Sequence, residues 1–293
     1  MTAEAIAVDD ALLRQWPLPE PEGDADKEDR GRVLVIAGSR EVPGAAILAA
    51  EAALRAGAGK LAVATPASAW TLVAQALPEA RVIALPETAG GGPSEESLGL
   101  LHDLARRTAA VLVGPGMMDA AGTGAFVRGL LPLFGRSRIV LDALAMDALA
   151  GMSAFDAPVL LTPHAGEMAH LSGLARGDIE ARPLAVAREY AARWNAVLAL
   201  KGATTCIAAR DAAWRHEAAT AGLATSGSGD VLAGLIAGLA ARGASLEQAA
   251  VWGVVLHARA GERLARRIGP LGFLARELAP EVPALLHESV SAR

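Results

Sequence analysis

The chain has 293 residues, 53% of them hydrophobic and only 3% aromatic, and a formal net charge of −5. An acidic chain without a basic, aromatic-interleaved run is a poor match for nucleic-acid binding, and a single cysteine, Cys206, excludes an internal disulfide framework. The sequence has no run of roughly 18 uncharged apolar residues that would predict a membrane span. The acidic first residues do not resemble a signal peptide. We therefore expect a soluble, cytoplasmic protein that binds neither nucleic acid nor membranes.

The chain order predicts an α/β domain behind a short leader. Residues 17–30 are rich in proline and charge, so residues 1–30 are predicted to be an N-terminal leader and residues 31–293 a single domain. Short apolar runs then alternate with alanine-rich helical patterns. The predicted strands are 33–37, 61–65, 82–85, 110–113, 139–142, 159–162 and 197–200. The predicted helices are 44–57, 67–76, 95–107, 120–133, 144–151, 165–172 and 181–194.

The last part of the domain is predicted to be a hairpin followed by helices. Residues 204–209 and 212–215 form the hairpin at the edge of the sheet, and two long helices, at 228–242 and 245–267, close the domain. Strands that are apolar throughout and separated by helices are typical of a mostly parallel sheet covered on both faces. Ligands bind such sheets at the carboxyl ends of the strands. We therefore expect the site where glycines and polar residues follow the predicted strands.

The most informative stretch is the turn before the predicted helix at 228–242. Gly227, Ser228 and Gly229 free the backbone for close approach, and the start of the helix offers N–H groups and positive dipole to an anion. Asp230 follows at once. An aspartate here could simply cap the helix, but beside a phosphate cradle it is also placed to accept a proton from an attacking hydroxyl.

Two further segments have both a structural and a functional reading. His164 either only caps the next helix or contacts a substrate, and Glu167 either only favours the first helical turn or belongs to a magnesium–phosphate network. Lys201 ends an apolar strand, where it either extends to the surface or supplies charge to a nucleotide phosphate.

These stretches resemble one known family, the ribokinase-like ADP/ATP-dependent NAD(P)H-hydrate dehydratases, over about residues 31–267. The resemblance is carried by Gly-Arg-Val-Leu-Val-Ile-Ala-Gly-Ser at 31–39, Pro-Gly-Ala-Ala at 43–46, Val-Gly-Pro-Gly at 113–116, Thr-Pro-His-Ala-Gly-Glu-Met at 162–168, Lys-Gly-Ala-Thr-Thr at 201–205 and Ser-Gly-Ser-Gly-Asp-Val-Leu at 226–232. It implies a three-layer α/β/α sandwich with a mostly parallel central sheet, in a stand-alone form without the epimerase domain that many relatives carry.

The resemblance also implies the site. Ala45, Gly116, His164 and Asp230 would contact the hydrated NADH or NADPH. The adenine nucleotide, ADP or ATP with Mg²⁺, would be held by Lys201, Gly202, Ala203, Thr204, Thr205 and Gly229. Asp230 would be the base and the 227–229 amides the anion hole. In the magnesium reading of Glu167 given above, that residue would be a metal ligand acting through water. The implied reaction restores NAD(P)H from the S-epimer of the hydrate, with release of AMP (or ADP) and phosphate.

The chain departs from the family pattern in ways that keep alternatives open. Ala165 replaces a proline, and Leu144 replaces a second aspartate after Asp142. A vitamin kinase of the same fold, phosphorylating a small hydroxymethyl or hydroxyethyl heterocycle, would use the same base. A nucleotide-binding relative without activity is the other alternative. The alanine- and leucine-rich helices also favour a homo-oligomer, a dimer or a tetramer.

Overall fold

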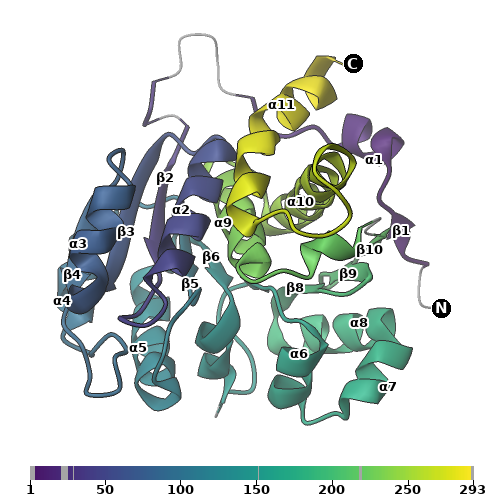
Figure 1. Ribbon diagram of the computed structural model, residues 1–293. Coiled ribbons are helices and arrows are strands. Elements are labelled where there is room, and N and C mark those ends of the chain that lie inside the picture. The colour runs from purple at the N-terminus through teal and green to yellow at the C-terminus, as the bar shows by residue number, and fades with distance from the viewer. Residues whose placement is uncertain (1–3, 21–25, 29, 151, 218–219, 292–293) are drawn as a thin grey trace.

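The structure is a computed structural model that describes residues 4–20, 26–28, 30–150, 152–217 and 220–291. A central sheet is covered by helices on both faces, as predicted (Figure 1). None of the helices in these ranges is long and apolar enough to cross a membrane.

The sheet has ten strands in the order β1-β10-β9-β8-β7-β6-β5-β2-β3-β4, parallel except where β9 pairs with β8 and with β10. The strands are β1 (Ile6–Ala7), β2 (Arg32–Ile36), β3 (Lys60–Pro66), β4 (Arg81–Leu85), β5 (Ala110–Val113), β6 (Arg138–Leu141), β7 (Val159–Leu161), β8 (Ala196–Leu200), β9 (Thr204–Ala208) and β10 (Ala213–Glu217). The strand order reverses between β2 and β5, and a parallel sheet binds its ligands at such a point.

The two helical layers use alternate residues of the same strands. On β2, Val33 and Val35 belong to one core cluster, and Leu34 and Ile36 belong to the other. The first cluster includes α1 (Asp10–Gln15), α2 (Pro43–Arg55), α3 (Ala67–Ala76), α9 (Ser228–Ala241), α10 (Leu246–Arg267) and α11 (Leu278–Ser291). The second includes α4 (Ser97–Ala105), α5 (Ala120–Leu133), η1 (Ala143–Leu149), α6 (Ala165–Ser172), α7 (Arg176–Ala181) and α8 (Pro183–Trp194).

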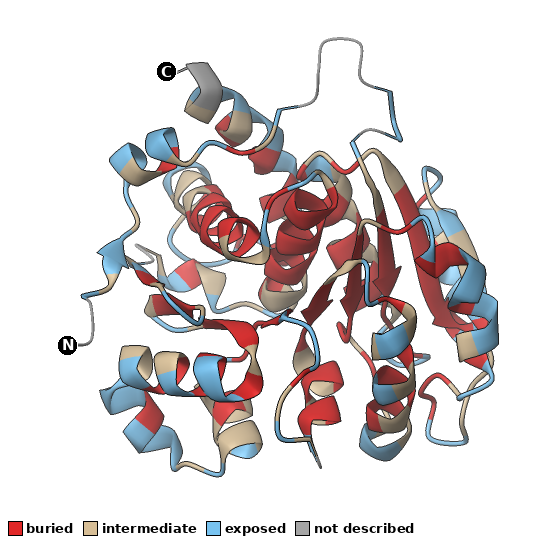
Figure 2. Ribbon diagram, turned by 180° about the vertical axis from the view of Figure 1, so that it is seen from behind, coloured by how far each residue is buried: buried red, intermediate tan, exposed pale blue. Residues whose placement is uncertain are grey.

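Small residues let α9 lie directly against α2 inside the first layer. A Cβ on Gly234 would be 2.2 Å from the carbonyl oxygen of Ala49, and one on Gly238 would be 2.3 Å from that of Ala53. Figure 2 shows α9 as a buried helix in the middle of its layer. This close packing fixes the start of α9, which carries Asp230, against the sheet.

Most predicted elements are present, and the differences have local causes. The helix predicted at 144–151 is the 3-10 helix η1, which begins at Ala143 with a φ of +47°. The helix predicted from 181 begins at Pro183, because proline suits a first helical position and disfavours a helical conformation in the residue before it. The prediction that two long helices close the domain was incomplete, because α11 comes after them.

Part of the predicted leader packs onto the domain. β1 pairs with β10, and Leu13 of α1 is buried in the first core cluster. Trp16 stacks on Trp214 with ring centroids 5.5 Å apart. The division of the chain at residue 30 stays a prediction, but β1 and α1 share a sheet and a core cluster with the predicted domain.

Candidate functional site

The segments singled out in the sequence lie at the carboxyl ends of the parallel strands. Gly38 follows β2 and its N–H donates to the carbonyl of Pro115, 2.7 Å away, in the turn after β5. Asp142 follows β6, and Lys201 follows β8. The amide of Lys201 donates to the carbonyl of Pro163 after β7 (2.8 Å). The predicted edge of the sheet is thus one continuous rim.

The turn before α9 leaves the backbone amides of Gly227, Gly229 and Asp230 without an acceptor among the described residues. Gly227 has a φ of +85°, and α9 begins at Ser228. The Ser228 amide already donates to the carbonyl of Thr225 (3.2 Å), whereas no acceptor within the described residues takes the amides of Gly229 and Asp230. The first turn of the helix can therefore offer these two N–H groups and its dipole to a phosphate.

The Ser228 hydroxyl faces away from that position. Its Oγ lies 2.9 Å from Nε2 of His257 on α10, and the same nitrogen is 3.0 Å from the Ser228 carbonyl oxygen. Both residues are buried, and burial is the main reason that the pKa of His257 falls to about 4. A neutral imidazole therefore contacts the start of α9 on the side away from the anion position. Of the predicted anion-hole amides, that of Ser228 has an acceptor, whereas those of Gly227 and Gly229 have none among the described residues.

Asp230 has the electrostatics of a base. Its carboxyl group is half-buried, and burial, followed by the charge of Asp142, raises its pKa to about 6. Lys201 opposes this rise, and Glu167 adds to it. A carboxylate with this pKa is mostly ionised at pH 7 and still binds a proton readily, as general-base catalysis requires.

Lys201 joins the carboxylates at the rim. Its Nζ is 3.3 Å from Oδ1 of Asp142 and 3.7 Å from Oε2 of Glu167. Burial opposes its charge, yet these two carboxylates raise its pKa overall, so the ammonium group is kept. Nζ also lies 3.4 Å from where a Cβ on Gly229 would stand, so the positive charge sits beside the start of α9.

His164 and Glu167 begin α6 with a capping box, so the predicted capping role of His164 and the first-turn role of Glu167 are confirmed. Nδ1 of His164 accepts the amides of Gly166 (3.0 Å) and Glu167 (3.1 Å), and Glu167 Oε2 accepts the His164 amide (2.7 Å). Because Nδ1 accepts, the proton of a neutral His164 is on Nε2, and that side chain is 59% exposed. Nε2 lies 3.6 Å from Oε2 of Glu167, which is longer than a hydrogen bond, so this N–H can still donate to a ligand.

A cleft lies next to this network and contains most of the predicted nucleotide residues. It has a volume of about 720 Å³. It is lined by His164, Gly166, Leu200, Lys201, Gly202, Ala203 and Thr204, among others. Thr205 is not in this lining and is buried in β9. His164, predicted on the substrate side, shares the cleft with the nucleotide residues.

Ala45 and Gly116 meet on the other side of the rim, at the β2–β5 reversal. Gly116 has a φ of +65°, and a Cβ on it would be 2.6 Å from Cβ of Ala45. Ala45 is only 3% exposed, so its contribution to a ligand surface is a small, close-packed wall.

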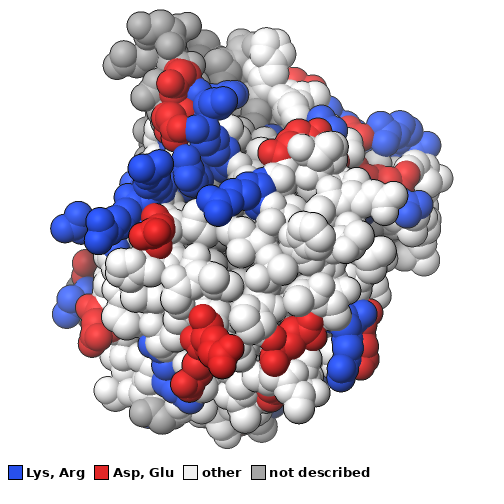
Figure 3. Space-filling view, turned by 90° about the vertical axis from the view of Figure 1, so that its left-hand side faces the viewer, with Lys and Arg blue, Asp and Glu red and all other residues white. Residues whose placement is uncertain are grey.

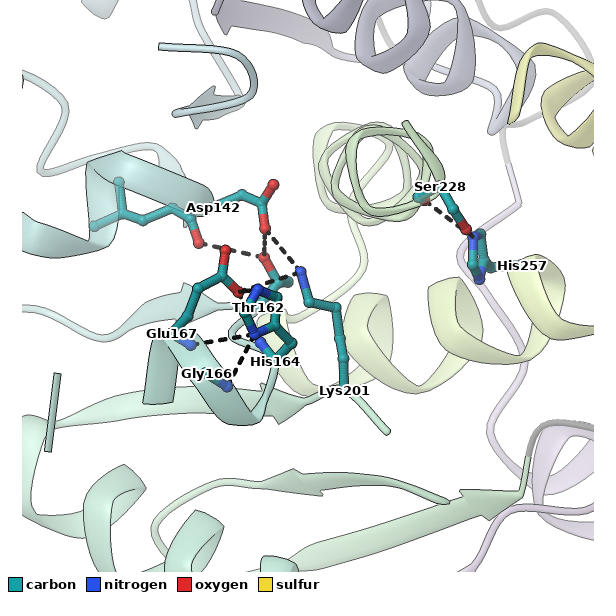
Figure 4. A network of polar contacts seen from close by, with 9 residues as sticks. Asp142, Thr162, His164, Gly166, Glu167, Lys201, Ser228 and His257 are labelled. Carbon is teal, nitrogen blue, oxygen red and sulfur yellow. Dashed lines mark hydrogen bonds and ion pairs between the residues drawn. The ribbon is translucent and has the colours of Figure 1, made fainter. Parts of the chain in front are cut away.

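The sequence-based site set lacks Asp142 and Thr162, which the structure places at its centre (Figure 4). The Thr162 hydroxyl donates to Oδ1 of Asp142 over 2.6 Å, and both residues are almost fully buried. A buried carboxylate next to Lys201 orients that ammonium group. The available signal was an aspartate directly after the apolar run 139–141.

The carboxylates could hold Mg²⁺ only together with the phosphates of a bound nucleotide and with water. No three His, Cys, Asp or Glu side chains in the described chain are grouped so that they alone could hold a metal ion. Mg²⁺ commonly keeps several waters and binds one or two carboxylates together with substrate phosphates. Glu167 meets this requirement, because its Oε1 makes no hydrogen bond or ion pair with the described residues.

Comparison with known proteins shows which family the chain belongs to. The chain is 48% identical to an ADP-dependent (S)-NAD(P)H-hydrate dehydratase of Xanthomonas campestris over 94% of each chain. Its fold matches a ribokinase-like superfamily protein of Enterococcus faecalis with a TM-score of 0.84 and 26% identity, over 97% of this chain and 96% of the other. It also matches an ADP/ATP-dependent NAD(P)H-hydrate dehydratase of Bacillus subtilis co-crystallised with ATP/Mg²⁺, with a TM-score of 0.80 and 27% identity over 98% of this chain and all of the other.

The family model described as NAD(P)H-hydrate dehydratase matches residues 33–284, which include nearly all of β2, every strand from β3 to β10 and the whole rim. The chain belongs to the NAD(P)H-hydrate dehydratase family and has its ribokinase-like fold.

Proposed function

We propose that this protein is an ADP-dependent (S)-NAD(P)H-hydrate dehydratase, a hydro-lyase that restores NADH or NADPH from its hydrate and releases AMP and phosphate. ATP in place of ADP would release ADP. One observation carries the proposal: a half-buried carboxylate, Asp230, with a pKa of about 6 stands at a helix start whose free amides and neighbouring Lys201 suit a phosphate.

Asp230 removes the proton from the ring hydroxyl of the hydrate. The hydroxyl oxygen forms a bond to the terminal phosphorus of the nucleotide, and the bond from that phosphorus to the bridging oxygen breaks to release AMP. The phosphorylated ring then expels phosphate as its carbon–oxygen bond breaks, and the adjacent ring carbon gives up a proton. Phosphate leaves more readily than hydroxide, so a phosphoryl transfer drives a dehydration.

The anion site assists the transfer through charge. The amides of Gly229 and Asp230 and the ammonium group of Lys201 stabilise negative charge on the transferring phosphoryl oxygens. Asp142 and Glu167 hold Lys201 in place, since they pair with its Nζ at 3.3 and 3.7 Å. His164 can donate from Nε2 to a phosphate or ribose oxygen in the cleft.

The nucleotide occupies the cleft beside β8 and β9, and the hydrate lies toward Ala45 and Gly116. The cleft volume of about 720 Å³ is ample for an adenine nucleotide. Bound Mg²⁺ would neutralise phosphate charge, and Glu167 would hold it through water. We further propose that the enzyme works in the cytoplasm as a homo-oligomer.

An absorbance assay tests the proposed activity. The protein is incubated with enzymatically hydrated NADH or NADPH, Mg²⁺ and either ADP or ATP, and the absorbance at 340 nm is followed. Recovery that requires a nucleotide supports the proposal. No recovery, with phosphate transferred to a small heterocyclic alcohol instead, would establish the vitamin kinase. No reaction with either substrate would leave a nucleotide-binding protein without activity.

A further inference from the structure

A second cleft lies at the amino-terminal ends of the strands, whereas Asp230 lies at their carboxyl ends. It is formed where β2 and β4 begin and where α4 ends, and it has a volume of about 430 Å³. Its lining contains Arg32, Arg81, Arg106 and Arg107 but one carboxylate, Asp103. Such a concentration of guanidinium groups is unexpected in a chain with a net charge of −5.

The positive charge of this cleft is largely uncompensated. Arg32 pairs with Glu28 at 3.5 Å, and Asp103 has its ion pair with the adjacent His102 at 3.7 Å. Among the described residues, Arg81, Arg106 and Arg107 have no ion pair within 4.0 Å. In the view of Figure 3, Lys and Arg side chains gather on the upper part of the face that carries β4 and the helices beside it.

Helix electrostatics explain only part of this cluster. Arg106 and Arg107 stand at the carboxyl end of α4, where the helix dipole favours cations. Arg32 and Arg81 come from strands, so the dipole of α4 does not account for their presence in the same cleft. Nε of Arg32 is also buried with no hydrogen-bond partner in the described chain, so a donor remains to be satisfied.

The chemistry of the lining indicates a phosphorylated ligand. One guanidinium group can donate two parallel hydrogen bonds to the oxygens of one phosphate. Several arginines that line one cleft can therefore hold more than one phosphate. The volume lies in the range of small-molecule sites, whereas a binding surface for an acidic protein needs no such concavity. Leu100, which is 52% exposed at the same cleft, offers an apolar surface to the organic part of the ligand.

We propose that this cleft binds a small phosphorylated metabolite with two or more phosphate groups, at a site separate from the dehydratase centre. The proposal does not depend on the proposed function, because none of its residues lies at the carboxyl rim of the sheet.

Calorimetric titration of the full-length protein with inorganic tripolyphosphate, at fixed ionic strength, tests it. The variants are Arg81→Ala/Arg107→Ala for the cleft, Lys201→Gln for the nucleotide site, and Arg210→Ala as a control with an exposed arginine elsewhere. Each charge-assisted contact with phosphate is worth about tenfold in affinity or more. We therefore expect the double variant to bind at least about tenfold more weakly, with Arg210→Ala and Lys201→Gln retaining this binding.

Several results would overturn the proposal. Tripolyphosphate could show no saturable binding, or binding that Lys201→Gln abolishes and the double variant retains. A preference for polyglutamate over tripolyphosphate would instead make the face a surface for an acidic protein. Thermal unfolding checks that each variant is folded. Arg81→Lys/Arg107→Lys keeps the charge but loses the planar fork, so an intermediate loss of affinity supports the proposal, and wild-type affinity in the Ala double variant contradicts it.

Discussion

Neutralising Asp142 should lower the pKa of Asp230, whereas neutralising Lys201 should raise it. Asp142 is the second cause, after burial, of the high pKa of Asp230, and Lys201 is the positive charge that opposes it. Asp142→Asn keeps an oxygen that can accept the Thr162 hydroxyl, and Lys201→Gln keeps much of the length of the side chain. The two substitutions therefore change charge more than shape.

The size of the effect follows from Coulomb's law. Two unit charges about 8 Å apart interact by about 1 kcal/mol at an effective dielectric constant of about 40, which is about 0.7 of a pKa unit. With a pKa of about 6, Asp230 is about 90% ionised at pH 7. A rise by this amount, to about 6.7, in Lys201→Gln would leave about two thirds of it ionised, before any loss of nucleotide binding.

The assay is the pH dependence of kcat/KM for recovery of NADPH from its hydrate. We expect an acid limb near pH 6 in the wild type, about half to one pH unit lower in Asp142→Asn, and higher by a similar amount in Lys201→Gln. Glu180→Gln, which neutralises a carboxylate in the same cleft that does not affect Asp230, serves as the control. A limb that stays in place in both variants, or moves the same way in both, would refute the assignment of Asp230 as the titrating base.

Three further predictions concern stability. Asp230→Asn should raise the free energy of unfolding at pH 7 by up to about 3 kcal/mol. The carboxyl group has a folded pKa of about 6 against an ordinary 3.8, so its ionisation destabilises the folded state increasingly from about pH 4 and fully above about pH 6. Urea unfolding should show that the gain vanishes below about pH 4. His257→Gln should make stability less dependent on pH. In the wild type this histidine binds a proton near pH 6.5 when unfolded but only near pH 4 when folded, so up to about 3 kcal/mol of stability is lost as the pH falls between these values, and the variant should not lose it. Equal pH slopes in variant and wild type would contradict this. Gly234→Ala should cost at least about 2 kcal/mol, because its Cβ would meet the Ala49 carbonyl at 2.2 Å, whereas Gly99→Ala, with nothing within 4 Å, should be neutral or stabilising in thermal unfolding.

The sequence predicted the sheet well because most of its strands are buried on both faces, although β4 at one edge is partly exposed. The runs that became β2 to β8 are almost entirely apolar, and the hairpin β9–β10 was found from its own pattern. β1 was missed, since two residues carry no periodicity and its pairing with β10 is a tertiary contact. α11 was missed because Pro283 lies inside it, where proline normally argues against a helix.

The sequence predicted where the candidate site lies, but it did not predict the hydrogen bonds and ion pairs among its side chains. Apolar strands ending in glycine or a charged residue placed Lys201 at this rim, and the glycine turn before a predicted helix singled out Asp230. The bond from Ser228 to His257 on α10 could not be seen, since local sequence does not say which way a hydroxyl turns. Asp142 was noticed as a strand end, and its pairing with Thr162 and Lys201 depends on strand order, which only the fold supplies.

The fate of the phosphoryl group tests the proposed chemistry most directly. ³¹P NMR and absorbance at 340 nm are recorded together while the wild type and Asp230→Asn act on hydrated NADPH with ADP and Mg²⁺. We predict inorganic phosphate and AMP in amounts equal to the NADPH recovered by the wild type, and recovery slower by a factor on the order of 10² with Asp230→Asn. A stable phosphate ester without NADPH, or undiminished turnover by Asp230→Asn, would contradict it.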